Sequence, residues 1–224
     1  NLEPGANHHP MPLLAVLAGA TVALTWGWHG FGLMLLVAFD ACLRPSDFLP
    51  LRRRDFKLPS DLASDDMEAY VVLMNAKTRK RSARRQQAQL RDPVLIPALE
   101  VFLANLSPDD FVFVAGADQK KAARQFRLAF DAVFSELGFA CNDVAGLVPA
   151  SLRAGGITHV FRETQDIPST RWRGRWDDVK SLEHYLQEMA AAELLSTLAP
   201  PARARVRRLA SLAPRLVREV SRRP

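Results

Sequence analysis

Two apolar runs near the start of the chain place the strongest constraint on its fold. Residues 13–26 and 31–43 are almost entirely hydrophobic, and the turn between them begins with Gly27 and ends with Gly30. Each run is shorter than the roughly 20 residues that a membrane-spanning helix needs, and the turn carries no charge that would anchor a membrane hairpin. The sequence therefore predicts two buried helices joined by a short turn, in a protein that does not insert into a membrane.

Composition indicates a folded protein whose positive charge is unevenly spread. The 224 residues are enough to bury the core of one large or two small domains. Hydrophobic residues make up 48% and charged residues 24%, which is typical of a globular protein and not of a disordered one. The net charge is +6, but residues 200–224 contain eight arginines and one glutamate, so the rest of the chain is close to neutral. A nucleic-acid surface there would need local segregation of charge.

We expect three segments along the chain. Residues 1–12 form an extended lead-in, residues 13–199 form the main domain, and residues 200–224 form an arginine-rich C-terminal helix or tail. Pro200-Pro201 marks the boundary before the last segment. Because the chain begins with Asn1 and not with methionine, we also expect that an N-terminal part precedes it.

The cysteines and the first histidines do not indicate a metal site. Cys42 and Cys141 lie in apolar surroundings, and neither belongs to a CxxC pair. We expect two reduced, buried thiols without a disulfide. His8 and His9 lie in the polar lead-in and are expected to be solvated. No metal and no cofactor is therefore expected.

The remaining patterns predict an α+β fold that is mostly α-helical. Short apolar runs at residues 55–58, 69–74 and 94–96 are typical of strands and are expected to form a small three-stranded antiparallel sheet. The ranges with helical patterns are 97–106, 119–137, 152–161, 167–172 and 179–195. The aromatic residues of the second range share one helical face and are expected in the core. The Gly155-Gly156 pair predicts the close approach of another backbone, of protein or of DNA.

Arg44 lies where the second apolar run ends. Pro45 disfavours helix at the residue before it, and Ser46 and Asp47 then begin a new short helix. A guanidinium at such a junction is costly unless a negative charge neutralises it. Two roles stay open: Arg44 pairs with Asp47 or Asp55 for structural reasons alone, or it holds an anionic ligand.

A basic segment separates the second and third predicted strands. Its seven cations, with no acidic residue between them, are Lys77, Arg79, Lys80, Arg81, Arg84, Arg85 and Arg91. The segment is expected to form a hairpin. Its charges either face solvent or lie along a phosphate backbone, where each neutralised phosphate releases a counterion.

Three residues further along connect these features. Arg153 begins a predicted helix, Trp176 follows an Arg-Gly-Arg turn 23 residues later, and Tyr185 lies nine residues beyond the tryptophan. Taken alone, Tyr185 would be an ordinary half-buried helix residue. These separations, together with Arg44 and the aspartate three residues after it, resemble the catalytic domain of the tyrosine recombinases, the phage-integrase family.

The resemblance covers roughly residues 13–199. It implies a helical catalytic domain of tyrosine-recombinase type, and site-specific DNA breaking and rejoining, as in integration and recombination, through a 3′-phosphotyrosine intermediate without a metal ion. Tyr185 would attack phosphorus, while Arg44 and Arg153 would bind the phosphate oxygens. Trp176 would donate its indole N–H to the phosphate and support the tyrosine.

The resemblance also gives roles to the basic residues. Lys77 would protonate the leaving 5′-oxygen, with Lys80 as the weaker candidate. The residues expected to contact DNA are Arg79, Lys80, Arg81, Arg84, Arg85, Arg173 and Arg175.

One position departs from the family pattern. The family has histidine or lysine three residues before its second arginine, and Ala150 occupies that position here. Alanine cannot accept the proton of the tyrosine, which leaves three alternatives. Ser151 or His184 accepts the proton instead, or turnover is slow, or the chain is a catalytically impaired relative that binds DNA without cutting it. His159, on the same helix, is expected to be structural.

The partners follow from the same resemblance. They are double-stranded DNA and further copies of the chain, as in the tetrameric synapse of relatives, with an N-terminal DNA-clamping domain outside this chain. The sequence does not identify the compartment; the resemblance implies an intracellular, DNA-associated protein, in the nucleus or the nucleoid. Residues 200–224 would pack on a neighbouring subunit, bind DNA or stay disordered. A competing reading is an unrelated helical protein whose basic tail meets RNA or an acidic partner.

Overall fold

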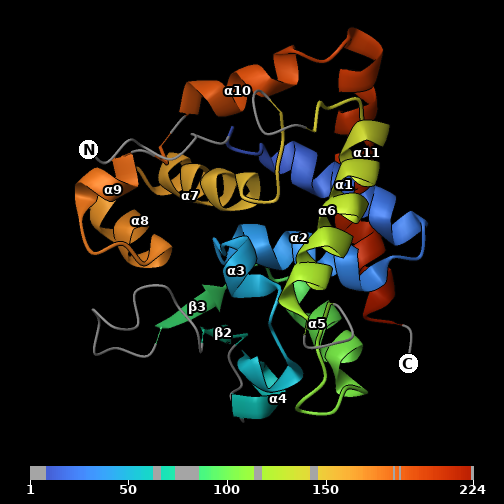
Figure 1. Ribbon diagram of the computed structural model, residues 1–224, viewed down its shortest axis with the longest axis vertical. Coiled ribbons are helices and arrows are strands. Elements are labelled where there is room, and N and C mark those ends of the chain that lie inside the picture. Colours follow the sequence, from blue (N-terminus) through green and yellow to red (C-terminus); the bar gives the residue numbers. More distant parts are fainter. Residues whose placement is uncertain are drawn as a thin grey trace.

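The computed structural model describes residues 9–62, 67–73, 86–113, 118–141, 146–183, 185–186 and 188–222. The helices along these residues are α1 (Leu13–Thr25), α2 (His29–Asp40), α3 (Pro45–Phe48), α4 (Pro59–Leu62), α5 (Leu95–Ala104), α6 (Gln119–Glu136), α7 (Ser151–Thr164), α8 (Ile167–Gly174), α9 (Val179–Glu183), α10 (Glu188–Ser196) and α11 (Pro200–Val220). A 3-10 turn, η1 (Arg53–Asp55), precedes the strands β1 (Phe56–Lys57), β2 (Ala69–Leu73) and β3 (Gln86–Leu90). The fold is mostly helical with a small antiparallel sheet, as the sequence predicts (Figure 1).

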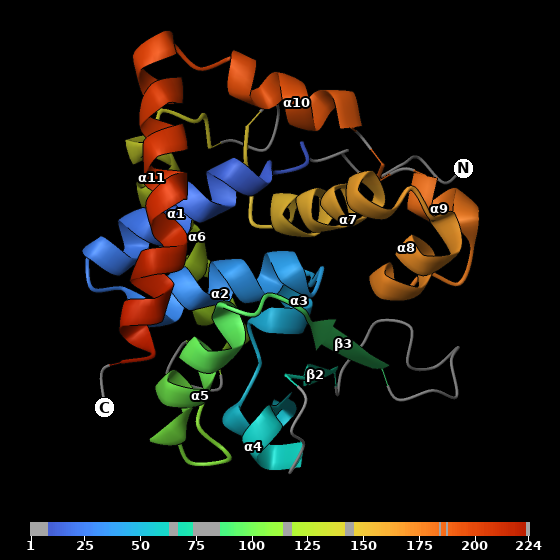
Figure 2. The ribbon, with the colours of Figure 1, turned by 180° about the vertical axis from the view of Figure 1, so that it is seen from behind.

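The core is built around α1 and α2. Helix α1 packs against α2, α6, α7 and α11 (Figures 1 and 2). Side chains from all around both helices are buried, among them Val16, Leu24, Phe31 and Leu35. This position explains why neither sequence has a polar face. The prediction of two buried helices is confirmed, and no helix in the described ranges is long and apolar enough to cross a membrane.

The sheet has the strand order β1-β2-β3, and both pairs are antiparallel. Its inner face is formed by buried residues at every second position, such as Val71 and Ala88, which pair with each other. The outer face carries Tyr70 opposite Gln89, and Gln87. This alternation follows from the two-residue repeat of a pleated strand.

The third strand is not where the sequence predicts it. Residues 94–96 enter α5, and the strand that pairs with β2 is Gln86–Leu90, within the basic segment. The Asp92 carboxylate accepts hydrogen bonds from the N–H groups of Val94 (2.8 Å) and Leu95 (3.2 Å), which starts a helix there. The strand that forms instead carries three glutamines and few apolar residues, so its own sequence does not predict a strand. Residues 86–90 are extended because they pair with β2.

The long helix α6 confirms the core assignment of its aromatic residues. Phe126, Phe130 and Phe134 are buried, and the rings of the last two lie 4.4 Å apart. Gly138, with φ of 90°, follows the end of the helix, where a left-handed residue is common.

The two glycines of α7 allow other parts of the same chain to lie against the helix. A Cβ on Gly155 would overlap the backbone of Met11, and one on Gly156 would overlap the carbonyl oxygen of Phe39. The predicted close approach of another backbone is therefore found, and the backbone is that of the protein. The α7 helix is thereby fixed directly over the end of α2.

Pro200–Val220 form the helix α11, which packs on α1 and α5. Its apolar stripe, which includes Val206, Ala210 and Val217, is buried in the same core as α1. The Thr21 hydroxyl of α1 donates a hydrogen bond to the Leu209 carbonyl (2.9 Å). The two prolines at its start occupy the first helical positions, where proline is tolerated because its missing N–H would be unpaired anyway.

Residues 179–195 form two helices where the sequence predicts one. The break between α9 and α10 contains Tyr185, whose carbonyl accepts a hydrogen bond from the Thr158 hydroxyl of α7 (2.8 Å). In a continuous helix that carbonyl would bind the N–H four residues on. A tertiary contact thus replaces a helical one, and the tyrosine lies in a turn.

Candidate functional site

Arg153 is the centre of the candidate site. It lies in the first turn of α7 and is only 2% exposed. Its Nη1 donates to the Cys42 carbonyl (2.6 Å) and its Nη2 to the Gly174 carbonyl (2.7 Å). The guanidinium carbon lies 4.2 Å from the centroid of the Trp176 ring and 5.8 Å from that of Tyr185. The structure therefore brings together three of the residues expected to act on a phosphate.

The two aromatic rings form a small cluster over this guanidinium. The ring centroids of Trp176 and Tyr185 are 4.8 Å apart at an interplanar angle of 56°, and both residues are half-buried. They pack on a separate hydrophobic cluster that includes Ile157 and Leu182. A Cβ on Gly174 would overlap the indole ring, so glycine at this position is what allows the tryptophan to fold back over the end of α8.

Arg44 lies at the start of α3, beside the same region. Its backbone N–H donates to Asp47 Oδ2 (3.0 Å), and its Nη1 lies 3.9 Å from the same oxygen. The Arg44 side chain is 25% exposed, whereas that of Asp47 is 3% exposed. Among the arginines Arg44, Arg153 and Arg175, Arg44 is thus the most exposed to solvent. Asp55, the second predicted partner, instead accepts the backbone N–H of Arg52 (2.9 Å).

Arg175 completes the cationic group. It adopts a left-handed backbone conformation just after α8 and donates to the carbonyls of Ala41 (3.0 Å) and Cys42 (3.0 Å). Its Nη2 lies 3.5 Å from Asp47 Oδ2, so one buried carboxylate is shared between Arg175 and Arg44. The end of α2, which carries the negative pole of the helix dipole, supplies the other acceptors.

Electrostatics favour the arrival of a further negative charge. Burial, together with the neighbouring cations Arg44 and Arg175, lowers the pKa of Arg153 to about 9. Burial also lowers the pKa of Arg175, which Asp47 opposes. The Nε atoms of Arg153 and Arg175 are buried without a hydrogen-bond partner. Among the described residues, Arg44 and Arg175 are the cations and Asp47 is the carboxylate that act on Arg153, so an anion would relieve the repulsion between the guanidiniums.

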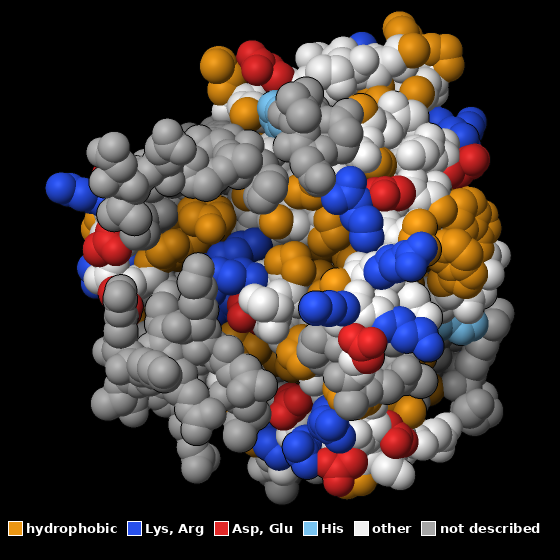
Figure 3. Space-filling model, in the orientation of Figure 1, with side chains coloured by type: hydrophobic (Ala, Val, Ile, Leu, Met, Phe, Trp, Pro, Cys, Tyr) orange, Lys and Arg blue, Asp and Glu red, His pale blue; other side chains and the backbone are white. Residues whose placement is uncertain are grey.

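Arg173 pairs with a different carboxylate, that of Asp40. Its Nη2 donates to both the carbonyl (2.7 Å) and the Oδ1 (2.9 Å) of Asp40. Burial raises the pKa of that carboxyl, and the Arg173 charge opposes the change. Figure 3 shows Lys and Arg side chains in a hollow between α8 and α3 on this face of the molecule.

Several predicted site residues lie outside the described residues. They are Lys77, Arg79, Lys80, Arg81, Arg84, Arg85 and His184. The hairpin expected to carry the catalytic lysine connects β2 to β3, because these strands pair directly.

No side chain takes the place left by Ala150 among the candidates that can be located. Ala150 caps α7. The fully buried Ser151 accepts a hydrogen bond from the Val148 N–H (3.1 Å), which is a structural role. His159 packs against the ring of Phe39 at 5.8 Å, as expected for a structural residue.

Sequence reasoning missed the part played by the end of α2. Cys42 has a φ of 50°, and its carbonyl holds both Arg153 and Arg175. A cysteine rarely adopts this conformation, so the sequence gives no signal for it beyond the Pro45 that follows. The sequence also gives no signal that the Thr158 hydroxyl binds the Tyr185 carbonyl and so helps to position the tyrosine.

Comparison with known proteins gives no further assignment: no family model matches the chain, and no curated protein is similar to it. Among the described residues, no group of three or more His, Cys, Asp and Glu side chains could hold a metal ion.

Proposed function

We propose that this chain is a DNA strand transferase of the tyrosine-recombinase type, with Tyr185 as the nucleophile. The observation that carries the proposal is the stack of Arg153, Trp176 and Tyr185 beside two further guanidiniums, those of Arg44 and Arg175. These residues come from four separate parts of the chain. Their convergence on one spot is what the spacing pattern requires.

The chemistry of a phosphodiester explains why such a group would be useful. The phosphate charge repels a nucleophile, and more negative charge develops on the non-bridging oxygens in the transition state. Arginine offers N–H donors in a fixed planar arrangement that fits these oxygens. A cluster with more guanidiniums than carboxylates is therefore preorganised to stabilise the negative charge that develops on the phosphate oxygens.

The proposed reaction keeps the number of phosphoester bonds constant. The Tyr185 phenol gives up its proton to solvent water, because Ala150 offers no base, its oxygen bonds to phosphorus, and the bond from phosphorus to the 5′-oxygen breaks. The 5′-oxygen takes up a proton, which we assign to Lys77 on the β2–β3 connection. Reversal by a second 5′-hydroxyl rejoins the DNA without an energy source.

DNA must open this site before it reacts. Arg153 is covered by Trp176 and Tyr185, which rest on a small cluster apart from the main core. Small satellite clusters open at a lower free energy than a main core does. We expect the turn that carries Tyr185 to move away from Arg153 when a phosphate enters.

A second candidate is a DNA-binding protein that does not cut. Ala150 removes the residue that would accept the tyrosine proton, and the 2% exposure of Arg153 fits a structural role for this guanidinium. In that case, the cationic group would hold the backbone of duplex DNA, and further copies of the chain would assemble along it.

Nicked duplexes that trap a covalent intermediate separate the two candidates. The nick lets a short strand diffuse away after cleavage, so an active enzyme accumulates as a protein–DNA adduct on a denaturing gel. We expect an adduct with the native chain and none with Tyr185→Phe. The phenylalanine variant retains the ring and the backbone bond to Thr158, so its folding is a fair control.

Arg153→Lys tests the role of the central guanidinium. It keeps the charge but loses the planar donors, and we expect adduct formation to fall about 100-fold or more. Binding of the same duplex, with its dependence on salt, is measured in parallel. Salt-dependent binding without any adduct across many target sequences supports the non-cutting candidate. A DNA affinity that does not change with salt concentration contradicts both the strand transferase and the non-cutting DNA-binding protein.

A further inference from the structure

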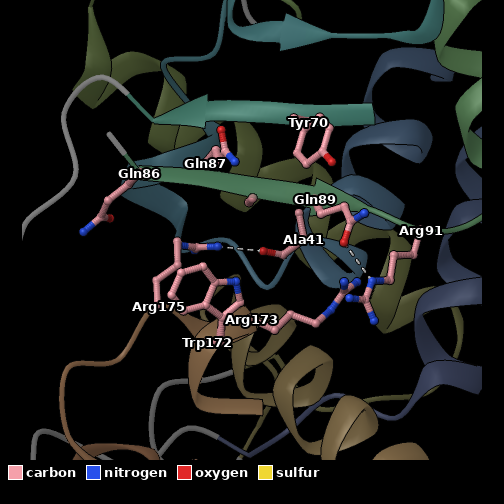
Figure 4. A pocket seen from close by; sticks show the side chains of 10 residues that line it. Ala41, Tyr70, Gln86, Gln87, Gln89, Arg91, Trp172, Arg173 and Arg175 are labelled. Carbon is pink, nitrogen blue, oxygen red and sulfur yellow. Dashed lines mark hydrogen bonds between the residues drawn. The ribbon is translucent and has the colours of Figure 1, made fainter. Parts of the chain in front are cut away.

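A cavity of about 410 Å³ opens between the sheet and α8, next to the candidate site (Figure 4). One wall is the outer face of β2 and β3, with Tyr70, Gln87 and Gln89. The opposite wall includes Trp172 and Arg175. The cavity thus shares one guanidinium with the site proposed for the reacting phosphate.

The sheet wall offers neutral hydrogen-bonding groups beside a ring. Glutamine has both amide donors and a carbonyl acceptor, so two such side chains can match the mixed donors and acceptors on the edge of a nucleobase. Tyr70 lies directly opposite Gln89 on the neighbouring strand and adds a phenol. Glu68 lies beside that phenol.

The helix wall offers an aromatic surface. Trp172 is 68% exposed, which is unusual for so large an apolar side chain, and its ring is turned toward the cavity (Figure 4). Exposed aromatic rings of this kind stack on unpaired bases regardless of base identity.

The charged side chains among the described residues that line the cavity are Arg91, Arg173 and Arg175. Arg91 donates its Nε to Gln89 Oε1 (3.0 Å), and Arg173 is held by Asp40. The Arg173 side chain is 9% exposed, and its Nε and Nη1 have no hydrogen-bond partner. Neither aspartate nor glutamate occurs among the described residues that line the cavity. The cavity therefore suits a ligand that has a base-like ring and a negative charge.

We propose that this cavity binds the nucleotide adjacent to the reacting phosphate, with its base against Trp172 and the sheet glutamines and its phosphate toward Arg173 and Arg175. The proposal rests on the proposed function, because it assigns to the substrate DNA an unstacked nucleotide beside the cleaved bond. It makes Gln87 and Gln89 the residues that would read that base.

Titration with nucleoside 5′-monophosphates tests the cavity without requiring cleavage. Binding is followed by tryptophan fluorescence, with inorganic phosphate and the corresponding nucleosides as separate titrants. We expect nucleotides to quench fluorescence and to bind at least about tenfold more tightly than phosphate, because stacking adds to the charge interaction. Trp172→Phe should abolish the quenching, whereas Trp26→Phe, which changes another exposed tryptophan, should leave it.

Paired variants then separate the base from the phosphate. Trp172→Ala should weaken nucleotide binding about tenfold and leave phosphate binding unchanged. Gln87→Ala combined with Gln89→Ala should change the preference among the four bases. Equal affinity for phosphate and nucleotides would show a simple anion site and overturn the proposal, as would quenching that survives in Trp172→Phe.

Nucleotide binding in the cavity can be measured independently of strand transfer. Tyr185→Phe should bind nucleotides like the native chain. If nucleotides bind through Trp172 but no covalent DNA adduct forms, the cavity proposal stands and the proposed reaction fails. If an adduct forms and Trp172→Ala alters neither nucleotide affinity nor base preference, the reaction stands and the cavity proposal fails.

Discussion

Arg153 and Trp176 are stacked, with the guanidinium carbon 4.2 Å from the centroid of the indole ring, although 23 residues separate them in the chain. The contact depends on α8 ending at Gly174 and on Arg175 turning the chain in a left-handed conformation. The arginine is thereby placed between the end of α2 and an aromatic cover. Its surroundings combine carbonyl acceptors, which suit a structural cation, with excess positive charge, which suits an anion.

Gly174→Ala should displace Trp176. Alanine normally stabilises a helix relative to glycine, but here its Cβ would overlap the indole ring. We expect a loss of about 2 kcal/mol in the free energy of unfolding, measured by urea denaturation. The same change in a Trp176→Ala background should lose much less, because the overlapping ring is gone. Equal losses in both backgrounds would contradict the assigned contact.

Gly156→Ala should separate α7 from the end of α2. The added methyl group would overlap the Phe39 carbonyl oxygen, and a backbone atom cannot move aside as a side chain does. We expect the free energy of unfolding to fall by at least about 2 kcal/mol. Gly30→Ala in α2 is the matched control, since the nearest atom to its Cβ would be at the end of the Phe102 ring, at 3.2 Å, and the nearest backbone atom, the Val112 carbonyl oxygen, lies at 3.6 Å. The control should lose clearly less stability.

Asp47→Asn should leave the cationic group without its carboxylate. Arg44 and Arg175 share Asp47 Oδ2, and removing one partner of a buried ion pair destabilises a protein by about 3 kcal/mol. Inorganic phosphate should restore part of the loss, so it should raise the Tm of the variant more than that of the native chain. Potassium chloride at equal ionic strength should not.

The control for that experiment is Asp109→Asn. Asp109 pairs with Arg52 and Arg54 at the surface, where its side chain is 69% exposed. Exposed pairs contribute at most about 1 kcal/mol, so little change and no specific phosphate effect are expected. A phosphate effect equal in both variants would argue against an anion site at Asp47.

Thr158→Val should loosen the turn that carries Tyr185. The variant keeps the shape of the side chain but loses the hydroxyl that donates to the Tyr185 carbonyl at 2.8 Å. We expect a loss of about 1 kcal/mol and faster hydrogen exchange in residues 182–186. Thr164→Val removes a similar hydroxyl bond to the Val160 carbonyl at an exposed position and should not change exchange there.

Stability should depend on pH through His159. Burial lowers the pKa of this imidazole below its ordinary value of 6.5, and Glu163 only partly opposes the effect. The unfolded chain therefore binds more protons than the folded chain between the lowered pKa and about 6.5. Stability should fall as the pH falls through that window. The loss of Tm from pH 7.5 to 5.5 should be smaller in His159→Gln, and an unchanged loss would contradict this assignment.

Hydrophobic pattern was enough to predict most of the helices, and pairing decided the sheet. The runs that become α1 and α2 have no polar face, and α6 has its phenylalanines at helical spacing, so each pattern has one reasonable solution. Residues 94–96 were predicted as a strand because β-branched and apolar residues favour strands. The same residues fit the start of a helix equally well, and there they begin α5. Gln86–Leu90 becomes a strand only because β2 lies beside it.

The sequence by itself determined the helical class of the fold and the spacing of Arg153, Trp176 and Tyr185, because periodicity and separation are properties of a linear chain. Only the tertiary structure decided that these three side chains touch and that Arg153 is buried beneath the other two. It also decided that Asp47 serves two guanidiniums. The reason is physical: the contacts depend on left-handed turns at Cys42 and Arg175 and on glycines that admit close packing, and these features are stabilised by surroundings from distant parts of the chain.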